Sequence, residues 1–151
     1  MLKFNTVLQD SGFDTEKVFL LRHEDKRVPF GLYQAWKSRR QDFEAFQSAQ
    51  KWKNRFPAGY SLAAFVVGQM RETLFVGIWN VLSLSQEDSS FNDPLLGAMP
   101  AEPRAQHKLQ YSDRMQEYEE RIVIEWGLGK LAWRQRASEQ DKVILEIRAQ
   151  A

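Results

Sequence analysis

The sequence contains no cysteine among its 151 residues. This absence excludes disulfide frameworks, thiolate zinc sites and cysteine nucleophiles, and it agrees with a reducing cytoplasm. Histidine is scarce as well, because only His23 and His107 are present, far apart and without a second ligand at metal-binding spacing. The sequence therefore predicts neither a metal site nor any other cofactor.

Long apolar runs are also missing. The N-terminal residues 1–13 lack the apolar core of a signal peptide, and no run approaches the roughly 20 apolar residues that span a bilayer. We therefore expect a soluble, cytoplasmic protein with no membrane partner. A composition of 43% hydrophobic and 27% charged residues is ordinary for a globular protein, and the length fits a single domain over residues 1–151.

The motifs of a self-contained enzyme are absent too. The segment GLG at 127–129 lacks the spacing of a dinucleotide fingerprint, and neither a phosphate-binding GKS or GKT nor a Gly-x-Ser-x-Gly elbow occurs. Glu119 and Glu120 are adjacent carboxylates, but they stand in a charged stretch where solvation is the expected role. The sequence predicts a binding module rather than an enzyme.

Short β-type runs dominate the second half of the chain and carry Trp79, Trp126 and Trp133. Such runs, after a more helical first half, favour an α+β fold with a small barrel. The expected strands after residue 59 are 60–69, 74–84, 121–127, 130–137 and 142–147, with the last three forming an antiparallel meander. The stretch 85–107 is rich in Ser, Asp, Pro and Gly and is expected to be a long surface loop.

The first half combines one strand with helices. A short helix is expected over residues 4–11, ended by Gly12 in a left-handed conformation, and a buried strand over 17–23. Between Gly31 and Lys53 apolar residues recur at three- and four-residue steps, which predicts a helix or a helix pair.

Within the strand at 74–84, Trp79 alternates with Phe75, Gly77 and Val81. This alternation places Trp79 on one face with those residues and favours a core position. A glycine inside a strand weakens it, so Gly77 is expected to mark a β-bulge or a close approach of the backbone.

Seven segments in this order resemble an N-terminal domain that precedes GIY-YIG nuclease domains in bacterial proteins. They are NTVLQDSGFDTEKVFLLRH, GLYQAW, FEAFQSAQ, LFVGIWNV, RIVIEWG, AWRQRA and DKVILEI. The layout is also similar to the EVE and PUA-like superfamily, in which a strand is followed by a helical excursion and a later strand reads FVGI. This resemblance implies a PUA-like (EVE-like) twisted antiparallel β-barrel with inserted helices.

Members of that superfamily hold a flipped modified base in a pocket, and several serve modification-dependent restriction endonucleases. The resemblance therefore implies a reader of double-stranded DNA that carries 5-methylcytosine or a 5-hydroxymethylcytosine-like base. The GIW at 77–79 has no YIG partner, so the nuclease motif itself is missing. Cleavage would then belong to a nuclease domain in the same full-length protein, which is a further expected partner.

An extruded base needs aromatic or apolar faces to stack on and polar groups for its Watson–Crick edge. The expected pocket residues are Tyr33, Trp36, Tyr60, Phe65, Trp126, Trp133 and Gln135. Phosphates need cations, and Arg134 with Arg136 on one strand face would suit them. The residues expected to contact the DNA backbone are Arg22, His23, Lys37, Arg39, Arg40, Lys51, Lys53 and Arg134.

Plainer interpretations stay open at this point. Trp36 lies on the apolar helical face and is either core or a pocket wall, and Arg22 with His23 can form surface ion pairs instead of contacting DNA. Two other ligand classes also stay open, an RNA-binding PUA-like module and an aromatic cage for a methylated lysine peptide. A cage needs acidic residues beside its aromatics, whereas the polar residues near Trp133 are basic or neutral.

Overall fold

The computed structural model describes residues 1–50, 56–91, 93–96, 102–127 and 133–150. The chain folds into two compact units. The first unit comprises Met1–His23, Tyr60–Asn80 and Tyr111–Ala151, and the second comprises Glu24–Gly59 and Val81–Gln110. The expectation of one recognition domain over residues 1–151 stays a prediction.

The first unit begins with helix α1, Phe4–Asp10, which presents one apolar face. Its buried residues Phe4, Val7 and Leu8 recur at helical spacing. Gly12 follows with φ +89°, the left-handed conformation that ends the helix as the sequence predicted. The 3₁₀ helix η1, Thr15–Lys17, then leads into strand β1, Val18–His23.

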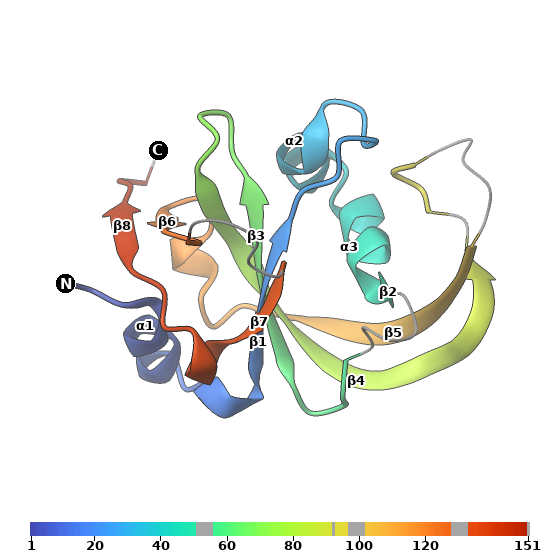
Figure 1. Ribbon diagram of the computed structural model, residues 1–151, viewed down its shortest axis with the longest axis horizontal. Coiled ribbons are helices and arrows are strands. Elements are labelled where there is room, and N and C mark those ends of the chain that lie inside the picture. Colours follow the sequence, from blue (N-terminus) through green and yellow to red (C-terminus); the bar gives the residue numbers. More distant parts are fainter. Residues whose placement is uncertain (51–55, 92, 97–101, 128–132, 151) are drawn as a thin grey trace. The chain divides into compact units, whose positions relative to one another are not determined.

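Among the described residues, eight strands are hydrogen-bonded in the order β2-β5-β4-β3-β1-β7, and β6 pairs with both β4 and β8. Within the first unit, β1 lies between β3 and β7 (Figure 1). Two short 3₁₀ helices, η3 and η4, occur between the later strands. The bounds are β2 Ala49–Gln50, β3 Ser61–Val67, β4 Thr73–Phe91, β5 Glu102–Ser112, η3 Gln116–Tyr118, β6 Ile122–Ile124, β7 Arg134–Arg136, η4 Ala137–Glu139 and β8 Ile144–Ile147.

The strand pairing differs from the expected antiparallel barrel in two places. β1 and β3 are parallel, which is possible because the connection between them is long and carries two helices. β7 pairs with β1, while β6 pairs with β8, so the predicted meander of the last three strands is wrong. Local patterns identify a strand, whereas its partner depends on contacts that are distant in sequence.

A β-bulge in β4 confirms the special role predicted for Gly77. Ala64 lies opposite Gly77 but Phe65 lies opposite Phe75, so β4 has one extra residue between them. The bulge changes the alternation of side chains, and Phe75 shares the first unit's core with Ile78 rather than a face with Trp79. Phe75 therefore departs from the predicted alternation, whereas Gly77 faces Trp79, whose expected burial is confirmed by its exposure of 0%.

The core of the first unit forms where α1 packs on one face of the strands. Phe4 contacts Phe65 and Phe75, with ring centroids 5.1 Å and 5.6 Å apart, and Leu20 and Ile78 belong to the same cluster. Edge-to-face and tilted aromatic pairs each stabilise by about 0.5–1.5 kcal/mol beyond the area they bury. These contacts hold α1 against β1, β3 and β4.

The second unit confirms the predicted helix pair. Helix α2, Gly31–Ser38, and helix α3, Arg40–Ser48, are separated by the non-helical Arg39, with φ −134° and ψ 53°. α2 buries Leu32, Ala35 and Trp36, which recur at three- and four-residue spacing. β2 follows α3 directly and pairs antiparallel with β5.

The expected loop over 85–107 is wrong at both ends, although the described residues 93–96 between the two strands are not strand. β4 continues to Phe91, and β5 begins at Glu102. Ser, Asp and Gly are poor strand formers in isolation, but β propensity is weak and yields to strand pairing. β4 and β5 are neighbours in the sheet, so pairing across the connection outweighs local composition.

Three α-helices and eight strands occur among the described residues, and they confirm the predicted α+β class. No helix in this part of the chain has the length and apolar character needed to cross a bilayer.

Candidate functional site

The predicted site residues are divided between the two units. Two pocket residues lie in the second unit on α2, namely Tyr33 and Trp36. The other five lie in the first unit and are Tyr60, Phe65, Trp126, Trp133 and Gln135. Each unit therefore presents its own candidate surface.

Four predicted residues of the second unit make ring contacts along α2 and at Arg40, the first residue of α3. Lys37 Nζ lies 5.8 Å from the centre of the Tyr33 ring, and the Arg40 guanidinium lies 4.3 Å from the centre of the Trp36 ring. Tyr33 and Trp36 are themselves 6.3 Å apart. We call Tyr33, Trp36, Lys37 and Arg40 the α2 ladder, which joins predicted pocket residues to predicted backbone-contacting residues.

Trp36 has the burial of a core residue, one of the two interpretations that the sequence left open. Its exposure is only 3%, and its indole Nε1 has no hydrogen-bond partner among the residues that the structure describes. A buried donor without an acceptor costs about 1–3 kcal/mol. Because this Nε1 is buried, no ligand reaches it in this structure, and the pocket role of Trp36 stays a prediction.

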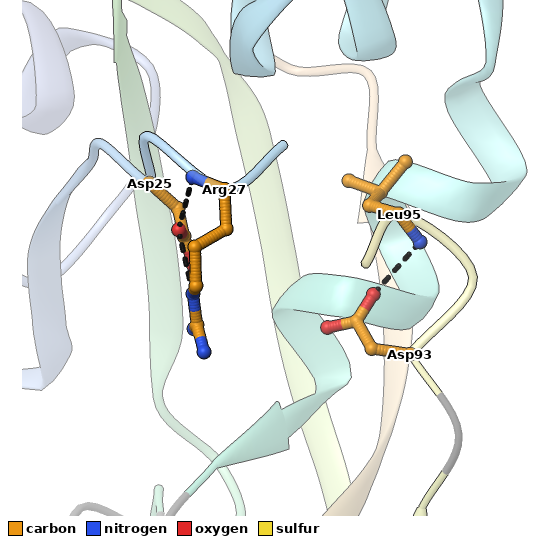
Figure 2. A network of polar contacts seen from close by, with 4 residues as sticks. All are labelled: Asp25, Arg27, Asp93 and Leu95. Atoms are coloured by element: carbon orange, nitrogen blue, oxygen red, sulfur yellow. Dashed lines mark hydrogen bonds and ion pairs between the residues drawn. The ribbon is translucent and has the colours of Figure 1, made fainter. Parts of the chain in front are cut away.

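Arg39 is engaged inside the second unit. Its guanidinium donates to Asp42 at 2.9 Å and to the Pro94 carbonyl at 3.1 Å. These bonds connect the α2–α3 junction to the segment after β4, where Asp93 accepts from Leu95 N (Figure 2). The predicted DNA contact of Arg39 would compete with these partners. Lys51 and Lys53 lie outside the described residues.

In a second turn of this unit, an aspartate carboxylate again accepts from the backbone N–H two residues further on. Asp25 accepts from the backbone N–H of Arg27 at 3.0 Å and pairs with its guanidinium at 2.8 Å, as Figure 2 shows. Short aspartate side chains stabilise turns in this way by bonding the backbone two residues on. The ion pair holds Arg27 close to the turn that precedes α2.

The first unit carries a layered stack at the β1–β7 edge. The Tyr60 and Phe19 rings are stacked with centroids 5.2 Å apart, and the Arg134 guanidinium lies 4.2 Å from the Phe19 ring centre. Arg136 approaches the same ring at 5.9 Å. We call Phe19, Tyr60, Arg134 and Arg136 the edge stack. Phe19 was not predicted, because its strand partner β7 could not be identified from local sequence.

The edge stack brings two guanidinium groups together. Burial lowers the pKa of Arg134, and the positive charge of Arg136 lowers it further. Both effects oppose the charged form of Arg134, and a bound anion would offset both. The edge of β7 is thus electrostatically suited to a phosphate, and the rings beside it are suited to a base.

The remaining predicted residues of β1 and β7 have varied surroundings. Arg22 donates from Nε to Thr73 Oγ1 at 3.1 Å, and its backbone N–H donates to the Trp133 carbonyl at 2.7 Å. His23 is buried, and its ring lies 6.0 Å from that of Trp133. Gln135 pairs with Leu20 and therefore points to the sheet face opposite Arg134.

Phe65 lies in the core of the first unit, and the partly buried Trp126 packs against that core. Phe65 is fully buried, with the Trp126 ring at 6.3 Å. Lys142 Nζ lies 4.6 Å from the Trp126 ring centre and donates to the Trp126 carbonyl at 2.6 Å. Burial lowers the pKa of Lys142, and the charge of Glu125 raises it in part. The pocket roles of Phe65 and Trp126 stay predictions.

Comparison of the chain with protein-family models, curated proteins and solved structures finds no match. The resemblance to the EVE and PUA-like superfamily therefore stays a prediction. Any functional conclusion has to come from the geometry of the two candidate surfaces.

Proposed function

We propose that this chain is a DNA recognition module for a modified base, built on a PUA-like fold. The expected ligand is a duplex with 5-methylcytosine or a 5-hydroxymethylcytosine-like base, which is extruded and stacked on aromatic rings. The observation that carries the proposal is the edge stack, where the Arg134 guanidinium lies 4.2 Å from Phe19 and Phe19 stacks on Tyr60. Planar rings for a base and cations for phosphate occur there together.

The sign of the charge separates this proposal from a peptide-binding cage. A cage for a methylated lysine needs negative charge close to its rings. The charged groups over Phe19 are Arg134 and Arg136, and those over Tyr33 and Trp36 are Lys37 and Arg40. Both surfaces favour an anionic ligand with flat rings, which is the chemistry of nucleic acid.

The order of elements supports the PUA-like part of the proposal. A strand, β1, is followed by the helices α2 and α3, and only then by β3 and the FVGI segment of β4. In the wider setting that we propose, the module supplies specificity to a modification-dependent restriction endonuclease. Its cleavage activity would come from a separate nuclease domain.

The test is a binding panel with one duplex sequence in hydroxymethylated, methylated and plain forms, together with single-stranded RNA. We expect a modified duplex to bind most tightly. Arg134→Gln should weaken that binding about tenfold to hundredfold, since a charge-assisted hydrogen bond contributes about 1.5–3 kcal/mol. Equal affinity for modified and plain duplexes, or tighter binding of RNA, would contradict the proposal.

Arg114→Gln is the matched control. Arg114 also belongs to the first unit, and its guanidinium lies 5.4 Å from the Phe13 ring centre while it donates to the Gly12 carbonyl. It is thus a cation over an aromatic ring outside the edge stack. We expect this variant to bind the modified duplex within about twofold of the wild type, since exposed charges far from the ligand contribute little.

A further inference from the structure

Exposed apolar side chains gather at one strand edge of the first unit. Among the described residues, seven large hydrophobic side chains are exposed, and four of them belong to β8 or to the N-terminal segment beside it. These four are Met1, Leu2, Leu145 and Ile147, with Leu145 60% and Ile147 39% exposed. A cluster of this kind marks an interaction surface more often than scattered single residues do.

β8 is an edge strand whose outer side is only partly covered. Its inner side pairs with β6. On the outer side, Ile144 N donates to the Leu2 carbonyl at 2.9 Å, and Lys3 forms a bridge with Val143. From Leu145 onward, no other described strand pairs with this outer side. The rest of β8 is therefore open to a further strand.

The backbone of Ile147 faces this open side. Arg148 N donates to the Arg121 carbonyl at 2.8 Å, and Ile147 lies opposite Ile122, so the N–H of Arg148 points toward β6. Backbone groups alternate in direction along a strand, so the N–H and C=O of Ile147 point away from β6. Such a free edge is a template for pairing with another chain.

The charges beside Ile147 favour a second copy of this chain as the partner. Glu146 and Arg148 flank Ile147 on the same face of the strand, and Arg148 Nε lies 3.5 Å from the Glu146 carboxylate. In an antiparallel pair with a two-fold axis at Ile147, Glu146 of each copy lies opposite Arg148 of the other. Opposite charges at directly opposed positions stabilise a strand pair. Glu72 already holds Arg148 in place by an ion pair.

The same charges select the register. An axis shifted by one residue, to Glu146, would place the two Glu146 carboxylates opposite each other, which destabilises a strand pair. We infer that β8 pairs antiparallel with β8 of a second copy around Ile147, so that the chain forms a symmetric homodimer. Two hydrogen bonds between the Ile147 residues and the contact of the exposed apolar side chains would hold it. This inference does not depend on the proposed function.

Sedimentation of the full chain from about 1 μM to about 1 mM tests the inference, and we expect the wild type to dimerise within this range. Glu146→Lys turns both opposite-charge pairs into like-charge pairs and should raise the dimer Kd about tenfold or more. Arg148→Glu should have the same effect. A mixture of the two variants should dimerise nearly as tightly as the wild type, because in the mixed dimer every cation again lies opposite a carboxylate.

Crosslinking tests the position of the axis. The sequence contains no cysteine, so an introduced cysteine reports on one position alone. A short bis-maleimide should join Ile147→Cys into a covalent dimer, since opposed residues of antiparallel strands have Cβ atoms about 4.5–5.5 Å apart. Phe30→Cys is the matched control, because Phe30 is 94% exposed and lies in the second unit, outside β8. We expect no crosslinked dimer from this control.

Circular dichroism first establishes that each variant keeps the wild-type fold, and the crosslink alone decides if Arg148→Glu does not fold. A wild type that stays monomeric over the whole range overturns the inference and leaves the edge to an extended segment of a different protein. A dimer that Glu146→Lys does not weaken, or a mixture of folded variants no tighter than either alone, also overturns it. Equal crosslinking of Phe30→Cys and Ile147→Cys has the same consequence. These measurements contain no DNA, so the proposed function stands or falls separately.

Discussion

In the second unit, the buried side chain of His107 hydrogen-bonds to two backbone groups that are far from it in the sequence. Its Nε2 accepts from Phe56 N at 2.9 Å, and because that nitrogen is an acceptor, Nδ1 carries the proton and donates to the Ser48 carbonyl at 2.8 Å. The two backbone partners thereby fix the tautomer of the ring. His107 thus connects the C-terminal end of α3 to the segment that contains Phe56, and its ring also lies 5.2 Å from the Phe56 ring.

We expect His107→Leu to lower the free energy of unfolding. The substitution removes the partner of one buried backbone donor and one acceptor, at about 1–3 kcal/mol for each group. Urea denaturation followed by circular dichroism measures the change. A denaturation midpoint equal to that of the wild type would show that these two bonds are not needed.

At position 77, both the backbone conformation and the neighbouring Trp79 ring oppose any side chain. Its φ is +149°, and a Cβ there would lie 3.1 Å from the Trp79 ring. Gly77→Ala should therefore destabilise by more than about 1 kcal/mol, through backbone strain and displacement of Trp79. Thermal unfolding tests this expectation.

Gly59→Ala is its control, because Gly59 also has positive φ, +87°, but a Cβ at this position would have no atom within 4 Å. The alanine there meets backbone strain alone. A loss of stability in Gly59→Ala as large as that in Gly77→Ala would contradict a role for the Trp79 contact.

At the scale of elements, the β3–β4 turn should be pH-sensitive. Burial raises the pKa of Glu72, but hydrogen bonds from Arg148 and the backbone lower it further than burial raises it. A lowered carboxyl pKa contributes stability above the ordinary value of about 4.3, and this contribution is lost as pH falls through the folded-state value. The stability difference between wild type and Glu72→Gln should therefore shrink in acid. Urea denaturation of both proteins from about pH 7 to about pH 3, a range that brackets the ordinary carboxyl pKa, measures this difference in unfolding free energy. A difference that stays constant over this range would refute the prediction.

The elements differ in how far the sequence predicts them. α2 and α3 follow from apolar residues at helical spacing, because a helix is made by neighbours in the chain. β7 is different, since its three residues pair with β1, far earlier in the sequence. The edge stack depends on that pairing, so Phe19 could be predicted as a strand residue but not as a partner of Arg134.

Most of the α2 ladder can be predicted from the sequence. Tyr33 stands three and four residues before Trp36 and Lys37 on α2, so these three share one side of that helix, whereas Arg40 follows the non-helical Arg39 and begins α3. The bulge at Gly77 was also predictable in kind, although its effect on the alternation in β4 was not. Sequence therefore indicates which residues meet inside an element, and tertiary pairing decides which meet across elements.

At the scale of the whole molecule, the net charge is only +1. A protein with so little excess charge should rely on a few local phosphate contacts, such as those of the edge stack. The logarithm of affinity should then fall with the logarithm of salt concentration with a slope of about −2 to −4, well short of the roughly −10 seen for DNA-binding proteins with many phosphate contacts.

The ratio of affinities for a methylated and a plain duplex of the same sequence, measured by competition at several salt concentrations, tests the central claim most directly. Both duplexes offer the same phosphates, so salt should weaken both complexes equally while the ratio stays constant and above one. A ratio of one at every salt concentration would contradict recognition of a modified base.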